Sequence, residues 1–218
     1  MKQRALGQYC GLARALEVVG ERWALLIIRD LLVRPRRYTD LREGLPGIPT
    51  NVLSTRLKEL EAAGVVERRL LMPPERAVVY ALTEHGRALD TAVLRLVRWG
   101  AGRLGDPRPG EVVTAESLVM ALRSTFRPEA AASVTATWEL HAGDIVLHAR
   151  VAGGEVHAGV GPSPDEPDLV ITMAPDGPPP LKELMTGELS PDTALAQGML
   201  DLTGDTRLLR TFADVFRI

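Results

Sequence analysis

A short segment that cannot continue a helix divides this sequence into two differently patterned halves. Residues 105–110 read Gly-Asp-Pro-Arg-Pro-Gly; proline lacks an amide hydrogen and blocks the preceding turn, and glycine favours turns. With 218 residues the chain is long enough for two modest domains, each with its own core. We therefore expect a first domain at 1–104, a linker at 105–111 and a second domain at 112–218.

The two halves carry opposite charge. Residues 1–104 hold 18 Lys and Arg against 11 Asp and Glu, a formal charge of +7, whereas residues 105–218 hold 8 and 17, a formal charge of −9. A basic module joined to an acidic one is typical of a polyanion-binding domain fused to a domain with a different task. The net charge of the whole chain, −2, conceals this asymmetry.

The first half predicts a series of helices, then a hairpin, then a long helix. Gly20 separates the first two helical patterns, Thr39 is a candidate N-cap for a short helix, and Pro49 suits the first turn of the next. Gly64 suits the left-handed residue that ends that helix. The expected helices are 12–19, 23–32, a short one from 39, 49–63 and 85–104, and the expected strands are 65–71 and 77–83, joined by Met-Pro-Pro-Glu-Arg.

One stripe of the expected 49–63 helix has the chemistry of a DNA reader. Three leucines at positions 53, 57 and 60 share a face and are expected in the core, which leaves polar and basic side chains facing solvent. Asparagine pairs bidentately with adenine, lysine binds guanine or phosphate, and short hydroxyls permit close approach. A helix face that meets only solvent uses the same residue types. The DNA-binding interpretation therefore depends on the basic residues near the helix, which can bind phosphates. The candidate DNA contacts are Arg37, Thr39, Pro49, Thr50, Asn51, Ser54, Thr55, Lys58, Arg68, Arg69 and Arg76.

The stretch from Cys10 to Gly100 resembles the HxlR-type winged-helix regulators, relatives of the MarR group. The resemblance implies a homodimer in which helices at 5–19 and 85–104 pack across a two-fold axis; a core within one chain is the alternative for their apolar faces. The sequence departs from the family at Glu21-Arg22, where glycine and lysine are expected, and at Pro49, where a small polar residue is expected. The motifs that carry the resemblance are Gly20-Glu-Arg-Trp23, Arg37-Tyr-Thr-Asp-Leu41, Leu45-Pro-Gly-Ile48, Leu53-Ser-Thr-Arg-Leu-Lys-Glu-Leu60, Gly64-Val-Val-Glu-Arg68, Val79-Tyr-Ala-Leu-Thr83 and Trp99-Gly100.

The second half predicts a sheet with helices packed on one face. A turn at Gly153-Gly154 pairs Val151 with Val156, which keeps the apolar faces of both strands together and places His148 opposite Gly159 on the polar face. No cysteine, aspartate or glutamate completes a ligand set with metal-like spacing around the histidines. We therefore expect no catalytic residue, no metal, no cofactor and no enzyme activity.

Residues 112–218 resemble the sterol-carrier-protein (type two) fold, an α/β sandwich whose apolar tunnel holds sterols, fatty acids or acyl chains without chemistry. The motifs are Asp168-Leu-Val-Ile-Thr-Met173, Leu181-Lys-Glu-Leu-Met-Thr-Gly187, the run 190–198 and Leu202-Thr-Gly-Asp205. The expected class is thus α+β, a winged helix-turn-helix followed by this sandwich. A filled core would use the same apolar residues as a ligand pocket. The candidate ligand-binding residues are Trp138, Leu140, Leu147, Ile171, Met173, Leu181, Leu184, Met185 and Phe212.

One cysteine, Cys10, excludes a disulfide within the chain, and no leader or long apolar run indicates secretion or a membrane. We expect a cytoplasmic, homodimeric regulator that binds double-stranded DNA and responds to an apolar or lipid-like small molecule. In the alternative, the second domain is only a structural or dimerisation module. Any sensing then falls to Cys10, a redox or electrophile sensor in several members of the HxlR group, unless this thiol is simply a small hydrophobe at a helix start.

Overall fold

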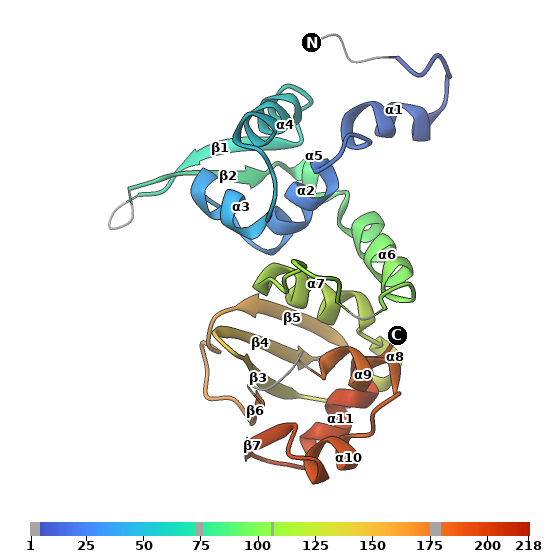
Figure 1. Ribbon diagram of the computed structural model, residues 1–218, viewed down its shortest axis with the longest axis vertical. Coiled ribbons are helices and arrows are strands. Elements are labelled where there is room, and N and C mark those ends of the chain that lie inside the picture. Colours follow the sequence, from blue (N-terminus) through green and yellow to red (C-terminus); the bar gives the residue numbers. More distant parts are fainter. Residues whose placement is uncertain (1–4, 73–75, 106, 175–179) are drawn as a thin grey trace. The chain divides into compact units, whose positions relative to one another are not determined.

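The chain forms two compact units, Met1–Val93 and Leu94–Ile218 (Figure 1). Their helices and mixed sheet confirm the predicted α+β class. The division between the units falls inside a helix, ahead of the 105–111 segment, and the functional boundaries given above remain a prediction. The computed structural model describes residues 5–72, 76–105, 107–174 and 180–218.

The first unit is a bundle of helices with a two-stranded antiparallel hairpin. Its elements are α1 (Gly11–Val19), α2 (Ala24–Val33), α3 (Tyr38–Gly44), α4 (Thr50–Ala62), β1 (Val66–Leu70), β2 (Val78–Leu82) and α5 (Glu84–Arg87), and α6 (Asp90–Ala101) crosses into the second unit. Residues 73–75, at the predicted hairpin tip, lie outside the described residues. The predicted order of helices followed by a hairpin is confirmed (Figure 1).

A tyrosine joins the start of α3 to the start of α4, and α2 and α4 supply buried aliphatic side chains to the core of the unit. Ile27 and Ile28 of α2 are fully buried. Leu53 and Leu57 of α4 are at most 1% exposed. The Tyr38 hydroxyl, at the start of α3, donates to the Thr50 carbonyl at 2.9 Å. The turn between these two helices needs Gly47, whose φ of +80° is the left-handed region that glycine adopts without steric cost.

Two predictions about helix ends in this unit are wrong. Thr39 is not the N-cap of the short helix: α3 begins at Tyr38 after Arg37, because the Asp40 carboxylate accepts the Arg37 backbone N–H at 3.0 Å. The helix expected over 85–104 is two helices, α5 and α6. The Thr83 hydroxyl accepts the Gly86 backbone N–H at 3.0 Å and starts α5 as a separate turn.

The second unit is built on a five-stranded sheet with strand order β5-β4-β3-β6-β7. The β3–β6 pair is parallel and the other three pairs are antiparallel. The register predicted for the β4–β5 hairpin is confirmed, with Val151 opposite Val156 and His148 opposite Gly159. The elements are α7 (Ala115–Thr125), α8 (Pro128–Ala131), β3 (Ala136–Ala142), β4 (Ile145–Ala152), β5 (Glu155–Val160), β6 (Leu169–Met173), α9 (Leu181–Thr186), α10 (Pro191–Ala196), β7 (Leu200–Gly204) and α11 (Leu208–Val215).

The end of α11 pairs with the chain that leaves α7. Phe126 and Phe216 form an antiparallel bridge, and their rings lie 6.0 Å apart. The Arg127 backbone N–H donates to the Val215 carbonyl at 2.8 Å, and the Arg217 N–H donates to the Thr125 carbonyl at 2.9 Å. Segments about ninety residues apart in sequence thus close the second unit.

Candidate nucleic-acid interface

Helix α4 presents a polar and basic stripe to solvent, as its leucine spacing predicts. Leu53, Leu57 and Leu60 are each buried to 1% exposure or less. Asn51 and Lys58, on the opposite side, are exposed. No hydrogen bond from either side chain to another described residue is observed, so both are available to a partner. The side chains that best suit base recognition are therefore these two.

The two hydroxyls of the predicted stripe are less available than the sequence suggests. Thr55 is half-buried, and its Oγ1 donates to the Asn51 carbonyl at 2.8 Å, one turn back along the helix. Ser54 is half-buried, and its Oγ lies 3.1 Å from the Tyr38 hydroxyl. A base contact by either hydroxyl has to compete with these bonds.

Four further candidates lie where α3 and α4 begin. Arg37 and Thr39 are exposed at the start of α3, and Pro49 and Thr50 are exposed at the start of α4, with Pro49 in the N-cap position. The first backbone N–H groups of a helix carry partial positive charge and suit a phosphate. The stretch before α3 is less basic toward solvent than its sequence implies, because Arg36 is only 7% exposed and donates to the Asp40 carbonyl at 2.8 Å.

The hairpin carries exposed arginines that are paired with glutamates. Arg68 donates to Glu61 at 2.9 Å, lies 5.6 Å from the ring centre of Tyr80, and its pKa is raised by the Glu61 hydrogen bond. Arg69 donates to Glu67 at 2.7 Å. The two arginine side chains are 51% and 48% exposed, and water screens such surface pairs strongly, so a phosphate can displace the glutamates. Arg76 is exposed and is the first described residue after 73–75.

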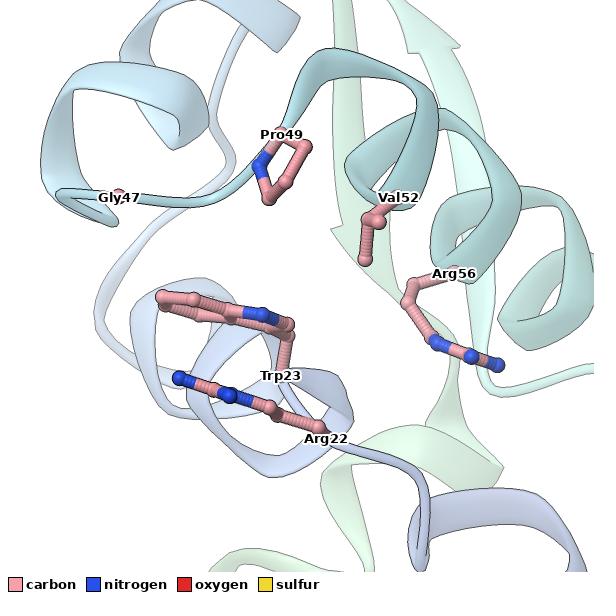
Figure 2. A pocket seen from close by; sticks show the side chains of 6 residues that line it. All are labelled: Arg22, Trp23, Gly47, Pro49, Val52 and Arg56. Atoms are coloured by element: carbon pink, nitrogen blue, oxygen red, sulfur yellow. The ribbon is translucent and has the colours of Figure 1, made fainter.

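Beside α4 lies a cavity that the sequence did not predict. It has a volume of 360 Å³ and lies between the start of α2 and the start of α4, lined by Arg22, Trp23, Gly47, Pro49, Val52 and Arg56. Figure 2 shows the flat face of the Trp23 ring turned toward Pro49, with Arg22 on the other side of the ring. Val52 points in from α4, whereas the guanidinium end of Arg56 turns away from the Trp23 ring.

Trp23 is held in an unfavourable backbone conformation at this cavity. Its φ is +79°, a left-handed value that costs a bulky residue on the order of 1–3 kcal/mol and persists only where the surroundings enforce it. The Glu21 carbonyl accepts the Ala24 N–H at 3.1 Å, and the Trp23 carbonyl accepts the Ile27 N–H at 2.9 Å. The Gly-Glu-Arg-Trp motif marked this position in the sequence, but only its dihedral angle reveals the strain.

The nine side chains proposed for ligand binding in the second unit lie together in its core. Each is 4% exposed or less. Trp138 makes edge-on ring contacts with Phe212 and Phe216, each at 5.9 Å, and its Nε1 donates to the Leu208 carbonyl at 3.1 Å. Aromatic rings on α11 and at its C-terminal end thus occupy the space next to Trp138.

The polar face of the same sheet carries a histidine–carboxylate cluster. His141 Nε2 lies 2.7 Å from Glu139, and the Ser163 backbone N–H donates to the same carboxylate at 2.7 Å, so the pKa of Glu139 lies below its usual value, chiefly because of His141. His148 Nδ1 lies 3.0 Å from the Gly161 carbonyl. Within the described ranges no group of three or more His, Cys, Asp or Glu is arranged to hold a metal.

Cys10 is exposed at the N-cap of α1. The backbone N–H groups of Ala13 and Leu12 lower the pKa of its thiol, because they stabilise the thiolate at the helix start. The helix itself also shows an apolar face to solvent, with Leu12 67% and Leu16 46% exposed.

Helix α6 has an exposed apolar face as well, with Leu96 49% and Trp99 66% exposed. Exposed large apolar residues at helical spacing are typical of a surface that another chain covers. In the part of the chain that is described, no helix is both long enough and apolar enough to cross a membrane.

Comparisons with known proteins match the two halves separately. The model of the HxlR-like helix-turn-helix family matches residues 18–106, and that of the SCP-2 sterol transfer family matches residues 121–217. The uncharacterized HTH-type transcriptional regulator Rv3095 of Mycobacterium tuberculosis is 44% identical over 96 residues, which cover 44% of this chain and 59% of that relative. The chain thus spans about three fifths of the length of that relative.

Two further similarities involve the same kind of protein. The HTH-type transcriptional regulator YodB of Bacillus subtilis is 39% identical over 85 residues, which cover 39% of this chain and 76% of YodB. Among solved structures, the redox regulator HypR in its oxidized form is 32% identical and matches 45% of this chain and 100% of its own, with a TM-score of 0.41.

Proposed function

The chain belongs to the HxlR-like helix-turn-helix family, with a second region of the SCP-2 sterol transfer family behind it, and from this we propose that it is a homodimeric transcriptional regulator that binds specific double-stranded DNA. The observation that carries the proposal is the exposed Asn51 and Lys58 on a helix whose other face is buried. Asparagine and lysine read base edges in the major groove.

In this proposal α4 is the recognition helix and the β1–β2 hairpin is the wing. Asn51 and Lys58 contact bases, and Ser54 and Thr55 add hydroxyl contacts once their internal bonds open. The exposed residues at the starts of α3 and α4, together with the wing arginines, hold phosphates. Phosphate contacts fix the position of the protein, whereas base contacts select the sequence. The proposed phosphate contacts are Arg37, Thr39, Thr50, Arg68, Arg69 and Arg76, whereas Pro49, which has no N–H to donate, only shapes the start of α4 at the DNA surface.

Replacing Arg68 and Arg69 together by alanine is expected to weaken binding to every duplex by a similar factor. Each lost phosphate contact releases about one fewer counterion, so the slope of log K against log salt should flatten by about two. Fluorescence anisotropy at several salt concentrations measures the slope, with a duplex selected by the wild-type protein from a random pool and with an unselected one. Arg87→Ala, also exposed but on α5, is the matched control. An unchanged slope in the double variant would contradict the wing assignment.

The dimer is proposed from the two exposed apolar helix faces, those of α1 and α6. A single recognition helix covers few base pairs, and a dimer reads two half-sites about 34–36 Å apart. The first helix begins at Gly11, so residues 5–10 of the predicted dimer segment are not helical.

The double substitution Leu12→Lys/Leu16→Lys is expected to convert the dimer into a monomer at micromolar concentration, because each chain would bury two charges in an apolar interface. Sedimentation velocity measures the mass. Arg14→Ala, on the other side of the same helix, should remain dimeric. A dimer that persists in the double lysine variant would rule out α1 as the interface.

Control of DNA binding by an apolar or lipid-like molecule in the second unit is also part of the proposal. Its support is the match to the SCP-2 sterol transfer family and the gathering of nine apolar side chains in one core. The alternative is a purely structural second unit with sensing by Cys10, which is exposed and has a lowered thiol pKa.

Native mass spectrometry of the purified protein separates these two. Ligand control predicts a dimer that carries extra mass from an apolar molecule, which is lost after delipidation. Sensing by Cys10 predicts no retained molecule but a covalent dimer after mild oxidation, which Cys10→Ser abolishes, because the thiol of each chain is the only one available. If the protein shows no extra mass and forms no covalent dimer, both forms of control are contradicted.

A further inference from the structure

We propose that the far half of the β1–β2 hairpin is an apolar wedge that enters the minor groove of the bound duplex and kinks it at a flexible base step. The wedge, which presupposes the DNA-binding function proposed above, selects sequence without a hydrogen bond to a base. It consists of Leu70, Met72 and Val78, whose exposed fractions are 69%, 75% and 54%. Single exposed apolar residues are ordinary, but neighbours on one surface indicate a partner.

The three residues of the wedge share one face of the hairpin. Leu70 and Val78 are directly opposite each other in the antiparallel register. The Leu71 backbone N–H donates to the Ala77 carbonyl at 2.8 Å, so the pairing continues beyond the ends of the two strands. Because side chains alternate between the two faces of a strand, Met72 follows Leu70 on the same side. The three side chains therefore form one apolar patch.

This patch lies at the part of the hairpin that is farthest from the core of the first unit. At the other end of the same two strands Val66 is opposite Leu82, and these side chains are only 2% and 0% exposed. Figure 1 shows the hairpin extending away from the helices of the unit. The strands thus change from a core element into an exposed two-stranded ribbon, the kind of element that fits a DNA groove. Packing within the unit does not explain the apolar side chains at its far end.

The charges around the patch favour DNA over a second copy of the chain. Arg68 comes two residues before Leu70 on the same face, opposite Tyr80. Arg76, which is exposed, comes two residues before Val78. Cations on both sides of an apolar patch match the two rows of phosphates that border a minor groove. Two copies of the chain that met through this patch would instead bring like charges together, which opposes association.

The same face of the hairpin borders the proposed recognition helix, since Arg68 donates to Glu61, in the last turn of α4, at 2.9 Å. With α4 in the major groove, a ribbon that continues from its side meets the neighbouring minor groove. Apolar side chains that enter a minor groove partly unstack one base step and bend the duplex by about 20–90°. Pyrimidine–purine steps unstack most easily, so the wedge favours duplexes with a TA or CA step at this point.

Energy transfer between dyes at the two ends of the selected duplex tests the kink with the full chain. Wild-type protein should bend the duplex by about 20° or more. Leu70→Ser/Met72→Ser should leave it straight and bind it about fivefold more weakly or worse, with an unchanged salt slope because every arginine remains. Leu70→Ile/Met72→Leu should keep the bend. Val112→Ser, which removes an apolar side chain that is 59% exposed outside the hairpin, should match wild type.

The fluorescence of 2-aminopurine, which rises when the base leaves the stack, locates the kink when this base replaces each adenine of the selected duplex in turn. We expect a clear rise at a step beside the bases that α4 contacts, and none with the double serine variant. Circular dichroism checks that this variant is folded, and Val78→Ser, on the opposite strand, repeats the test with a different side chain.

A selected duplex that stays straight with wild-type protein, or that the folded serine variants bend as strongly as wild type, would overturn the wedge and leave the proposed function standing. Serine variants that become monomeric in sedimentation velocity, yet still bend the duplex, would overturn it as well and identify the patch as a contact between chains. If the wild-type protein selects no duplex from the random pool, the proposed function fails, and the wedge fails with it.

Discussion

Replacing both Asn51 and Lys58 by alanine is expected to remove recognition of the selected duplex while leaving a weak affinity for unselected DNA. Both side chains are exposed on α4, and no described residue competes for them through a hydrogen bond. A good base-reading pair contributes about 1–3 kcal/mol, so the loss of two should weaken specific binding by roughly 30-fold or more. Fluorescence anisotropy on the selected and unselected duplexes measures the ratio.

The pattern of loss distinguishes this variant from the wing variant. Loss of base readers lowers the ratio of specific to unselected affinity, whereas loss of wing arginines lowers both affinities together. Thr55→Ala should have a smaller effect than Asn51→Ala, because the Thr55 hydroxyl is already bonded to the Asn51 carbonyl. Lys182→Ala is the control: it also deletes a lysine, but in the second unit, and should leave both affinities unchanged. A double variant that still prefers the selected duplex as strongly as wild type would exclude α4 as the recognition helix.

Trp138→Ala is expected to destabilise the second unit more than any surface substitution, by about 3–5 kcal/mol. The indole is fully buried, contacts the ring of Phe212 on α11 and that of Phe216 just after it, and donates to the Leu208 carbonyl. Truncation leaves a cavity and a carbonyl without its donor. Urea unfolding followed by circular dichroism, with the two units fitted as separate transitions, measures the change.

Trp138→Phe provides the matched comparison. It keeps most of the ring volume and removes the Nε1–H donor, so its cost should be about 1 kcal/mol, close to that of one lost hydrogen bond, because the Leu208 carbonyl keeps its helical partner in α11. A loss below about 1 kcal/mol for the alanine variant would mean that α11 repacks over the vacated space. In that case Trp138 would not organise this core.

Much of the fold could be predicted because its patterns are local. The spacing of Leu53, Leu57 and Leu60 correctly identified the buried face of α4, and the Gly153-Gly154 turn correctly set the register of β4 with β5. Both depend on residues close in sequence, where periodicity and turn geometry are decisive. Helical spacing and turn residues also gave the order of helices and hairpin in the first half, whereas the resemblance of the second half implied its α/β sandwich.

The parts that could not be predicted depend on contacts between distant segments or on single hydrogen bonds. Arg36 stands between Arg34 and Arg37 in a basic stretch of the sequence, but the Asp40 carbonyl, reachable only after α3 forms, holds it in the interior. Thr39 has the right chemistry for an N-cap, yet the Asp40 carboxylate places the N-cap of α3 two residues earlier, at Arg37. The cavity beside α4 needs the left-handed Trp23, which no periodicity reveals.

The bridge between Phe126 and Phe216 also has a consequence for how the protein is made. Contacts that join residues about ninety positions apart form only after the intervening chain has been ordered, and such topologies fold slowly. On the ribosome, where the chain emerges from its N-terminus, the first unit can fold while the second still lacks the partner of Phe126. Until α11 emerges, the apolar faces of β3 and β6 have no aromatic cover, which makes this interval the one in which a nascent chain most needs a chaperone.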